Sequence, residues 1–320
     1  MEFFRNTNID WLGKKWYFLG FSMIFSVAGI LSMLFWHGIP KGVDFTGGTQ
    51  VRVAFDSKPN EDHIRQAMDR GGVHNATIQS VSDPSGHAAN KVIIALPISS
   101  ATDQAHDVGR QSVENALSAN YHDSKFQVEQ VEIVGPTAGK QLQKQAWLAT
   151  VYSLIGMLIY LWFRFELIYG VAAVVAVFHD TLITVGAFSL TNQQITLTVI
   201  AAILTLIGYS MNDTIVVFDR IRENLGISRR ESLADVVNRS INQTLSRTVL
   251  TSGLTFLTVL SLYLFGGEVL HGFSFALVVG ILIGTYSSIA VAAPMLVAYQ
   301  EWRTSRGKAV SLPAGKRAKA

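Results

Sequence analysis

The chain of 320 residues contains no cysteine. This absence excludes disulfides, thiolate nucleophiles and cysteine-ligated metal sites. Charged residues make up only 15% of the chain, against about 25% in soluble domains. The net charge of +3 is too small to indicate nucleic acid as a partner. The eight histidines form no H-x-x-x-H pair and no G-x-x-x-x-G-K-[ST] segment is present, so we expect no metal, no organic cofactor and no phosphate-binding loop of that kind.

Hydrophobic residues are abundant instead, at 49% of the chain with a mean hydropathy of +0.30. They gather in blocks close to the length of about 20 residues that a membrane-spanning helix needs. The blocks cover residues 16–36, 146–163, 167–190, 195–218, 248–265 and 269–297. The first block has no A-x-A-like cleavage site before Lys41, which favours an uncleaved span over a signal peptide. We therefore predict an α-helical integral membrane protein with six transmembrane helices.

The basic residues predict the orientation of these spans, because short cytoplasmic segments carry an excess of Lys and Arg. Residues 1–15 contain 3 such residues, the loop or helix 219–247 contains 6, and residues 301–320 of the tail 298–320 contain 6. The short turns near Asn192 and Gly267 contain none. We expect both termini on the cytoplasmic side, with residues 37–145 outside. The basic tail from Arg303 to Lys319 is expected to meet anionic lipid.

Residues 37–145 form a domain of their own. Alternating patterns predict strands over 49–55, 76–82, 91–98 and 126–134, and helical periods predict helices over 59–72 and 101–121. The order βαββαβ is that of a ferredoxin-like α+β domain. We predict that this domain lies between the first and second transmembrane helices.

Asp213 is the one ionisable residue in the span 195–218. A carboxylate within hydrocarbon costs about 2.5–3.5 kcal/mol on insertion scales, so it normally has a partner, a water-filled cavity or a function. Desolvation favours the neutral acid and a nearby cation favours the carboxylate, so balanced surroundings allow a proton to load and unload. We predict a proton-relay site. The structural alternative is an Asp close enough to the helix end to reach the lipid headgroups.

Other polar residues in the spans have two interpretations each. His179 and Asp180 are neighbours in the third span and either form a second relay station or a structural hydrogen-bond cluster, for instance with Asp180 bonded to Thr184. Tyr209, four residues before Asp213, shares its helix face and can orient the carboxyl group or line a water path.

Packing and capping signals complete the pattern. Gly280 and Gly284 form a G-x-x-x-G pair that indicates close helix packing. Ser228 and Glu231 form a capping box that predicts a helix up to about Ser246. That helix is expected to lie at the membrane interface, to dock a partner, or to pack beneath its own bundle.

Seven motifs, in this order and at this spacing, resemble those of SecF subunits in the SecD/SecF family of the resistance-nodulation-division superfamily. They are GVDFTGG (42–48), EIVGPTAG (132–139), FRFE (163–166), FHD (178–180), GYSMNDTIVVFDRIREN (208–224), SRTVLTS (246–252) and YLFGG (263–267). The resemblance covers roughly residues 11–300, and the long motif around Asp213 is its most specific part.

The resemblance implies an accessory subunit of the bacterial Sec protein-export machinery in the inner membrane, with residues 37–145 in the periplasm. It implies pairing with SecD, association with YajC and the SecYEG channel, contact with the translocating polypeptide, and an indirect relation to the ATPase SecA. The implied activity couples the proton motive force to late export, with H⁺ as the coupling ion and Na⁺ as an alternative. It also implies that Arg247 acts with Asp213, whereas from the residues alone Arg247 is an ordinary cytoplasmic anchor.

Three rival functions remain. Half of a proton-driven small-molecule or lipid exporter of the same superfamily would share the membrane carboxylates. A passive scaffold would not need Asp213 at all. An enzyme is not expected, because no set of nucleophile, base and orienting group is visible.

Overall fold

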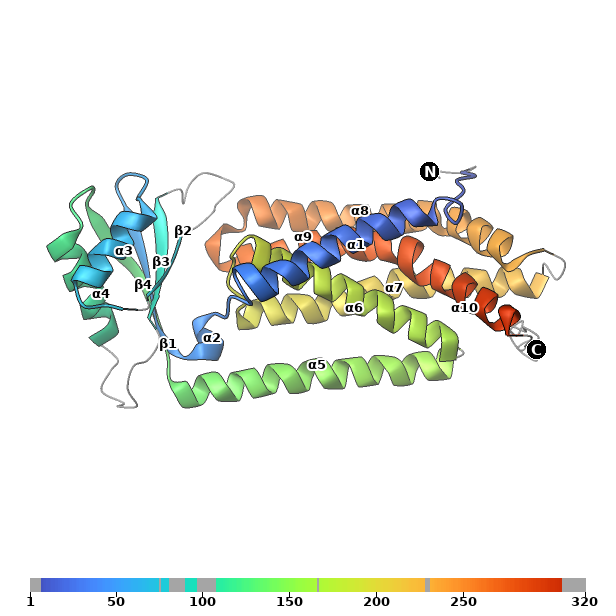
Figure 1. The fold of residues 1–320 in the computed structure, drawn as a ribbon, viewed down its shortest axis with the longest axis horizontal. Helices are drawn as coiled ribbons and strands as arrows, with labels where there is room; N and C mark the ends of the chain where they lie inside the picture. The colour runs from blue at the N-terminus through green and yellow to red at the C-terminus, as the bar shows by residue number, and fades with distance from the viewer. Residues whose placement is uncertain are drawn as a thin grey trace.

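The computed structural model has a small α+β domain at one end and a bundle of long helices at the other (Figure 1). It describes residues 7–74, 76–80, 90–96, 108–165, 167–227 and 231–306. Within these ranges six helical segments are long and apolar enough to cross a membrane, which confirms the predicted number. They are α1 (Lys15–Leu31) with the π-turn η1 (Ser32–Trp36), α5 (Pro136–Arg164), α6 (Leu167–Leu190), α7 (Leu197–Ile227), α8 (Leu233–Phe265), and α9 (Gly267–Ser287) continued by the π-turn η3 (Ser288–Ala292) and α10 (Ala293–Ser305).

The α+β domain confirms the predicted ferredoxin-like order. Its elements are α2 (Val43–Thr46), β1 (Gly48–Phe55), α3 (Glu61–Arg70), β2 (Thr77–Ser80), β3 (Lys91–Leu96), α4 (Val108–Asn120) and β4 (Phe126–Val134). The four strands are antiparallel in the order β2-β3-β1-β4. Parts of the predicted elements, at 81–82, 97–98 and 101–107, lie outside the described residues.

The core of this domain lies on one face of its sheet. Val51 and Val53 of β1 point to that face and are fully buried with Ile64 of α3 and Leu117 of α4. Alternation puts their neighbours Gln50 and Arg52 on the opposite face. Helices therefore cover one face of the sheet, and no helix among the described residues of this domain covers the other.

Several helices extend beyond their predicted limits. The span expected from 146 begins at Pro136, directly after Gly135, because proline suits the first position of a helix. Residues 219–227 continue α7, and the helix predicted to end near Ser246 runs without a break into the fifth span. The helix start was also wrong, since the side chain of Ser232 caps α8 by accepting from the backbone N–H of Asp235 at 3.1 Å. Ser228 lies outside the described residues.

The first half of α8 packs beneath its own bundle, which was one of three predicted possibilities. Val236, Val237 and Ile241 are fully buried there. The side-chain amide of Asn224 at the end of α7 donates to Ser240 Oγ at 2.8 Å. The helical hairpin of α7 and α8 thus continues past the predicted end of the membrane spans.

The centre of the bundle is formed by α6, α7 and α9, whereas α1 and α5 lie outside it (Figure 1). One close contact joins α1 to this centre. A Cβ built on Gly186 of α6 would lie 2.7 Å from Cα of Gly29 in α1. Only glycine at both positions permits this approach, because carbon atoms normally rest about 3.5–4.0 Å apart.

Candidate functional site

Asp213 lies on the buried face of α7, with 2% of its surface exposed. The hydroxyl of Ser252 in α8 donates to its Oδ2 at 2.6 Å. This is the one side-chain hydrogen bond that the described residues make to the carboxyl group. The result is a carboxyl group between two helices with free lone pairs, which suits a group that exchanges a proton.

Arg247 begins the membrane part of α8 and is exposed. Its charge acts on Asp213, yet among the described residues it forms no ion pair with that carboxylate. Thr248, the next residue, has a buried hydroxyl without a hydrogen-bond partner in the described part of the chain. The structure therefore places the cation near Asp213 but not on it.

Tyr209 does not orient Asp213. Its hydroxyl is buried and makes no hydrogen bond within the described residues. The expected role as an orienting group is thus taken by Ser252. Asn212, the residue before Asp213, is exposed on the outer side of α7.

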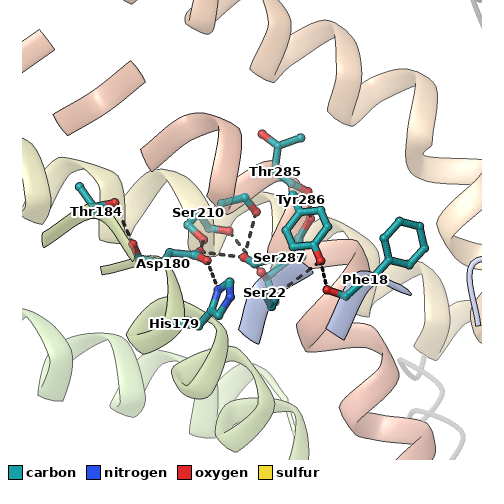
Figure 2. Close-up of polar contacts among 12 residues, drawn as sticks. Phe18, Ser22, His179, Asp180, Thr184, Ser210, Thr285, Tyr286 and Ser287 are labelled. Atoms are coloured by element: carbon teal, nitrogen blue, oxygen red, sulfur yellow. Dashed lines mark hydrogen bonds and ion pairs between the residues drawn. The ribbon is translucent and has the colours of Figure 1, made fainter. Parts of the chain in front are cut away.

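Asp180 lies at the centre of a second polar cluster (Figure 2). Its Oδ2 accepts from Ser210 Oγ of α7 at 2.5 Å and from Ser287 Oγ of α9 at 2.8 Å. Its Oδ1 lies 2.9 Å from Nδ1 of His179. Thr184 donates to the backbone oxygen of Asp180 at 2.8 Å, so the predicted local bond exists but does not involve the carboxylate. The hydrogen bonds to this carboxylate connect three helices, α6, α7 and α9.

The predicted glycine pair supports this cluster. A Cβ on Gly284 would lie 3.0 Å from Cβ of Ser210 and 3.5 Å from Oδ2 of Asp180. A Cβ on Gly280 would press into the side chain of Leu206. Both glycines therefore bring α9 against α7, and η3 begins directly after Ser287. Such π-turns are frequent at functional sites.

The two carboxylates are connected through α7. Ser210, which bonds to Asp180, lies one turn before Asp213, a rise of about 4.5 Å along the helix. A third polar group joins α9 to α1, where Tyr286 donates to the backbone oxygen of Phe18 at 2.5 Å and accepts from Ser22 at 3.3 Å (Figure 2). The bundle thus contains three separate groups of polar contacts between α8 and α1.

At the end near the α+β domain, the start of α7 is bound to the segment that leads into β1. Asp44 Oδ2 accepts from the backbone N–H of Leu197 at 2.8 Å. Two backbone hydrogen bonds pair this segment with Ile195, from Gly42 N to Ile195 O at 2.9 Å and from Ile195 N to Pro40 O at 2.7 Å. The motif GVDFTGG therefore contains a one-turn helix, α2, held against α7.

Sequence analysis did not single out the three serines that bond to the carboxylates. Ser210 lies three residues before Asp213 in the same motif, and this spacing along one helix was the available signal. Ser252 lies in the motif of Arg247, on a different helix from Asp213. Ser287 lies in none of the motifs. No cluster of three metal-ligating side chains occurs in the part of the chain that the structure describes.

Comparison with known proteins identifies the family. The model for the C-terminal region of SecD/SecF protein-export membrane proteins matches residues 113–302, and the model for the SecD/SecF GG motif matches residues 35–59. The protein translocase subunit SecF of Koribacter versatilis is 55% identical over 97% of this chain and 96% of its own length. That of Calditerrivibrio nitroreducens is 42% identical over 92% and 96%.

Solved structures agree with this assignment. A crystal structure of SecDF, a translocon-associated membrane protein from Thermus thermophilus, is 36% identical, with a TM-score of 0.81 over 92% of this chain. A structure of SecDF in a super-membrane-facing form is also 36% identical, with a TM-score of 0.66 over 94% of this chain. This chain spans 39% and 40% of those two chains. The protein is a multi-pass membrane protein and belongs to the SecF family of protein translocase subunits.

Proposed function

We propose that this protein is an accessory subunit of the Sec translocase that couples the proton motive force to late steps of polypeptide export. The observation that carries the proposal is the site of Asp213, a buried carboxyl group with a single hydroxyl donor at 2.6 Å and a cation nearby that forms no ion pair with it. A carboxyl group with one hydrogen-bond donor and no ion pair can take up and release a proton with little rearrangement.

The two membrane carboxylates have different roles in this proposal. Asp180 is engaged by two serine hydroxyls and by His179, which fixes the positions of three helices. Asp213 has one donor, so its remaining lone pairs stay available to a proton or a water molecule. Asp213 is therefore the carrier, and Asp180 and His179 hold the bundle around it.

Arg247 acts as a reversible partner. In this arrangement the guanidinium is exposed and apart from Asp213, and its long side chain can reach along the helix when Asp213 loses its proton. One charge crossing about 100 mV is worth roughly 2.3 kcal/mol. That energy shifts an equilibrium between two conformations by well over tenfold, on the order of fiftyfold.

The link between proton and polypeptide runs along α7. Asp213 lies on this helix, and its first residues are bound to the segment before β1 through Asp44 and Ile195. A shift of α7 would therefore move the α+β domain. The unequal TM-scores against two SecDF structures of equal identity support the existence of more than one arrangement in this family.

The proposed orientation puts both termini in the cytoplasm and the α+β domain in the periplasm, with the spans in the bacterial inner membrane. The Lys and Arg distribution supports it. The start of α1 and the end of α10 also lie at the end of the bundle away from the α+β domain (Figure 1).

SecD is the proposed direct partner, with YajC, the SecYEG channel and the polypeptide as further contacts and SecA as an indirect one. On the outer side of α7 the small or polar residues Thr205, Gly208 and Asn212 are exposed. In a membrane such a face favours helix–helix contact over lipid. We place SecD against this face.

The test compares two carboxylates on α7. Asp213→Asn removes the proposed carrier, whereas Asp219→Asn changes an exposed carboxylate six residues further on, which pairs with Arg164 at 2.7 Å. We expect Asp213→Asn to abolish the export stimulation that depends on the proton gradient, with normal insertion and normal co-purification of a second six-span subunit. Asp219→Asn should retain the stimulation. Normal stimulation by a correctly inserted Asp213→Asn protein would refute the relay, and imposed H⁺ and Na⁺ gradients tested separately identify the coupling ion.

A further inference from the structure

A cleft of about 470 Å³ separates the α+β domain from the ends of the membrane helices. One wall is the sheet face that lacks helices, and the other is the turn between α6 and α7 together with the start of α9. The volume lies within the range of about 300–1,000 Å³ that ligand-binding pockets have.

Strand register defines the sheet wall. Gln79 of β2, Ile93 of β3 and Arg52 of β1 are cross-strand neighbours in one row. In a second row Gln50 of β1 lies opposite Glu132 of β4. All five residues line the cleft. Four of them present long polar side chains, in two rows perpendicular to the strands, and Ile93 lies between Gln79 and Arg52.

The opposite wall is also rich in amides. Asn192, Gln193 and Gln194 line it in succession. The side chain of Gln79 reaches across from the sheet and donates to the backbone oxygen of Asn192. Oε1 of Gln193 is buried and has no hydrogen-bond partner among the described residues. A buried acceptor without a donor costs free energy, so a donor within reach of the Gln193 side chain would be favourable.

We propose that this cleft binds an extended segment of the translocating polypeptide through its main chain. Amide side chains carry both donors and acceptors, as the peptide backbone does. Backbone recognition does not depend on the side chains of the bound segment, which is what a site for many different exported chains needs. The proposal rests on the proposed function and specifies which surface of the domain meets the polypeptide.

The cleft holds charges of both signs, with an excess of negative charge. Asp44, Glu61 and Glu132 are acidic and Arg52 is basic. Amide side chains line both walls beside these charges. A polar, extended occupant that carries no excess of negative charge matches this lining.

The cleft also connects the polypeptide to α7, the helix that holds Asp213. Asp44 lines it and at the same time accepts from the first backbone N–H of α7. A polypeptide in the cleft would therefore contact the residue that binds the domain to α7. The binding site and the proton site then lie on one continuous helix.

The experiment places a photo-crosslinking amino acid in the full-length protein within its membrane, at Gln79 on one wall or at Gln193 on the other. The matched control is Gln66, which has the same side chain and is exposed on α3, the helix that covers the other face of the sheet. An export substrate is stalled in the channel before illumination. We expect crosslinks to the stalled substrate from both cleft positions and none from Gln66.

Crosslinks from the cleft positions to a partner subunit or to lipid alone would overturn the proposal, as would equal yields from Gln66. Asp213→Asn is measured in parallel to separate the two claims. If Asp213→Asn loses the stimulation and the cleft positions give no crosslinks to the substrate, the proposed binding at the cleft is refuted and the relay stays intact. If the cleft positions crosslink to the substrate and Asp213→Asn keeps normal stimulation, the relay is refuted and the proposed binding at the cleft is supported.

Discussion

Substitution of Gly186 by alanine tests the packing of α1 against the centre of the bundle. The new methyl group would lie 2.7 Å from Cα of Gly29, a backbone atom that no side-chain rotation can remove. To restore a normal carbon contact, α1 must retreat by about 1 Å. That movement also strains the hydrogen bond between the hydroxyls of Ser32 and Ser189, which measures 2.8 Å. Such overpacking costs about 1–3 kcal/mol.

The matched control is Gly156→Ala in α5, where an added Cβ has no neighbour within 4 Å. Alanine favours a helix over glycine by up to about 1 kcal/mol, and this gain cancels when the two variants are compared. Thermal unfolding of the purified protein in mild detergent, followed by tryptophan fluorescence, gives the difference. We expect Gly186→Ala to melt several degrees below Gly156→Ala, since 1 kcal/mol corresponds to about 2–4 °C or less at this chain length. Equal melting temperatures, or a higher one for Gly186→Ala, would show that the close approach of α1 and α6 is wrong.

Three further predictions concern the N-terminal segment, an ion pair of Asp219 and the α+β domain. Asn242→Ala removes two hydrogen bonds to the backbone of Ile9, at 3.0 and 2.9 Å, so amide hydrogen exchange near Ile9 should become faster while exchange in the α+β domain stays unchanged; unchanged protection at Ile9 would contradict it. Asp219→Asn should cost less than about 1 kcal/mol, because its ion pair with Arg164 is exposed, and a cost that persists in high salt would contradict a surface pair. Burial, helped by the charge of Asp123, raises the pKa of Tyr121 above its ordinary value. The folded protein therefore holds the phenol proton of Tyr121 more tightly than the unfolded chain does. The stability that this proton contributes is full below the ordinary pKa and is lost as pH rises through the raised pKa. Alkaline absorbance titration of the protein and of Tyr121→Phe should differ by one phenol that ionises above the ordinary pKa, and a difference at the ordinary pKa would contradict the prediction.

The α+β domain could be predicted well from sequence because its strands alternate in hydrophobicity and are bounded by turn residues. The strand 126–134 was predicted with the limits that the structure shows. The membrane helices were found by hydropathy, which detects only their apolar parts. For that reason the polar ends of α5, α7 and α8 were assigned to loops or to a separate helix.

The neighbours of the carboxylates could not be predicted from single residues. Asp213 stood out because a charge in an apolar span is rare, whereas serine is common in such spans, so nothing distinguished Ser252 or Ser287. The arrangement of Arg247 depends on the conformation of a long side chain, which periodicity does not determine. The contact of Gly29 with Gly186 joins one glycine in each of two helices, a pattern that no motif within one helix can reveal.

Infrared difference spectroscopy in lipid bilayers tests the central claim about Asp213 most directly, with Asp213→Asn as the reference that removes the signal. The account predicts a carboxylic-acid band, absent from the variant, that appears in mildly acidic medium and disappears as the medium becomes alkaline. A carboxylate that remains ionised throughout would contradict a proton carrier at this position.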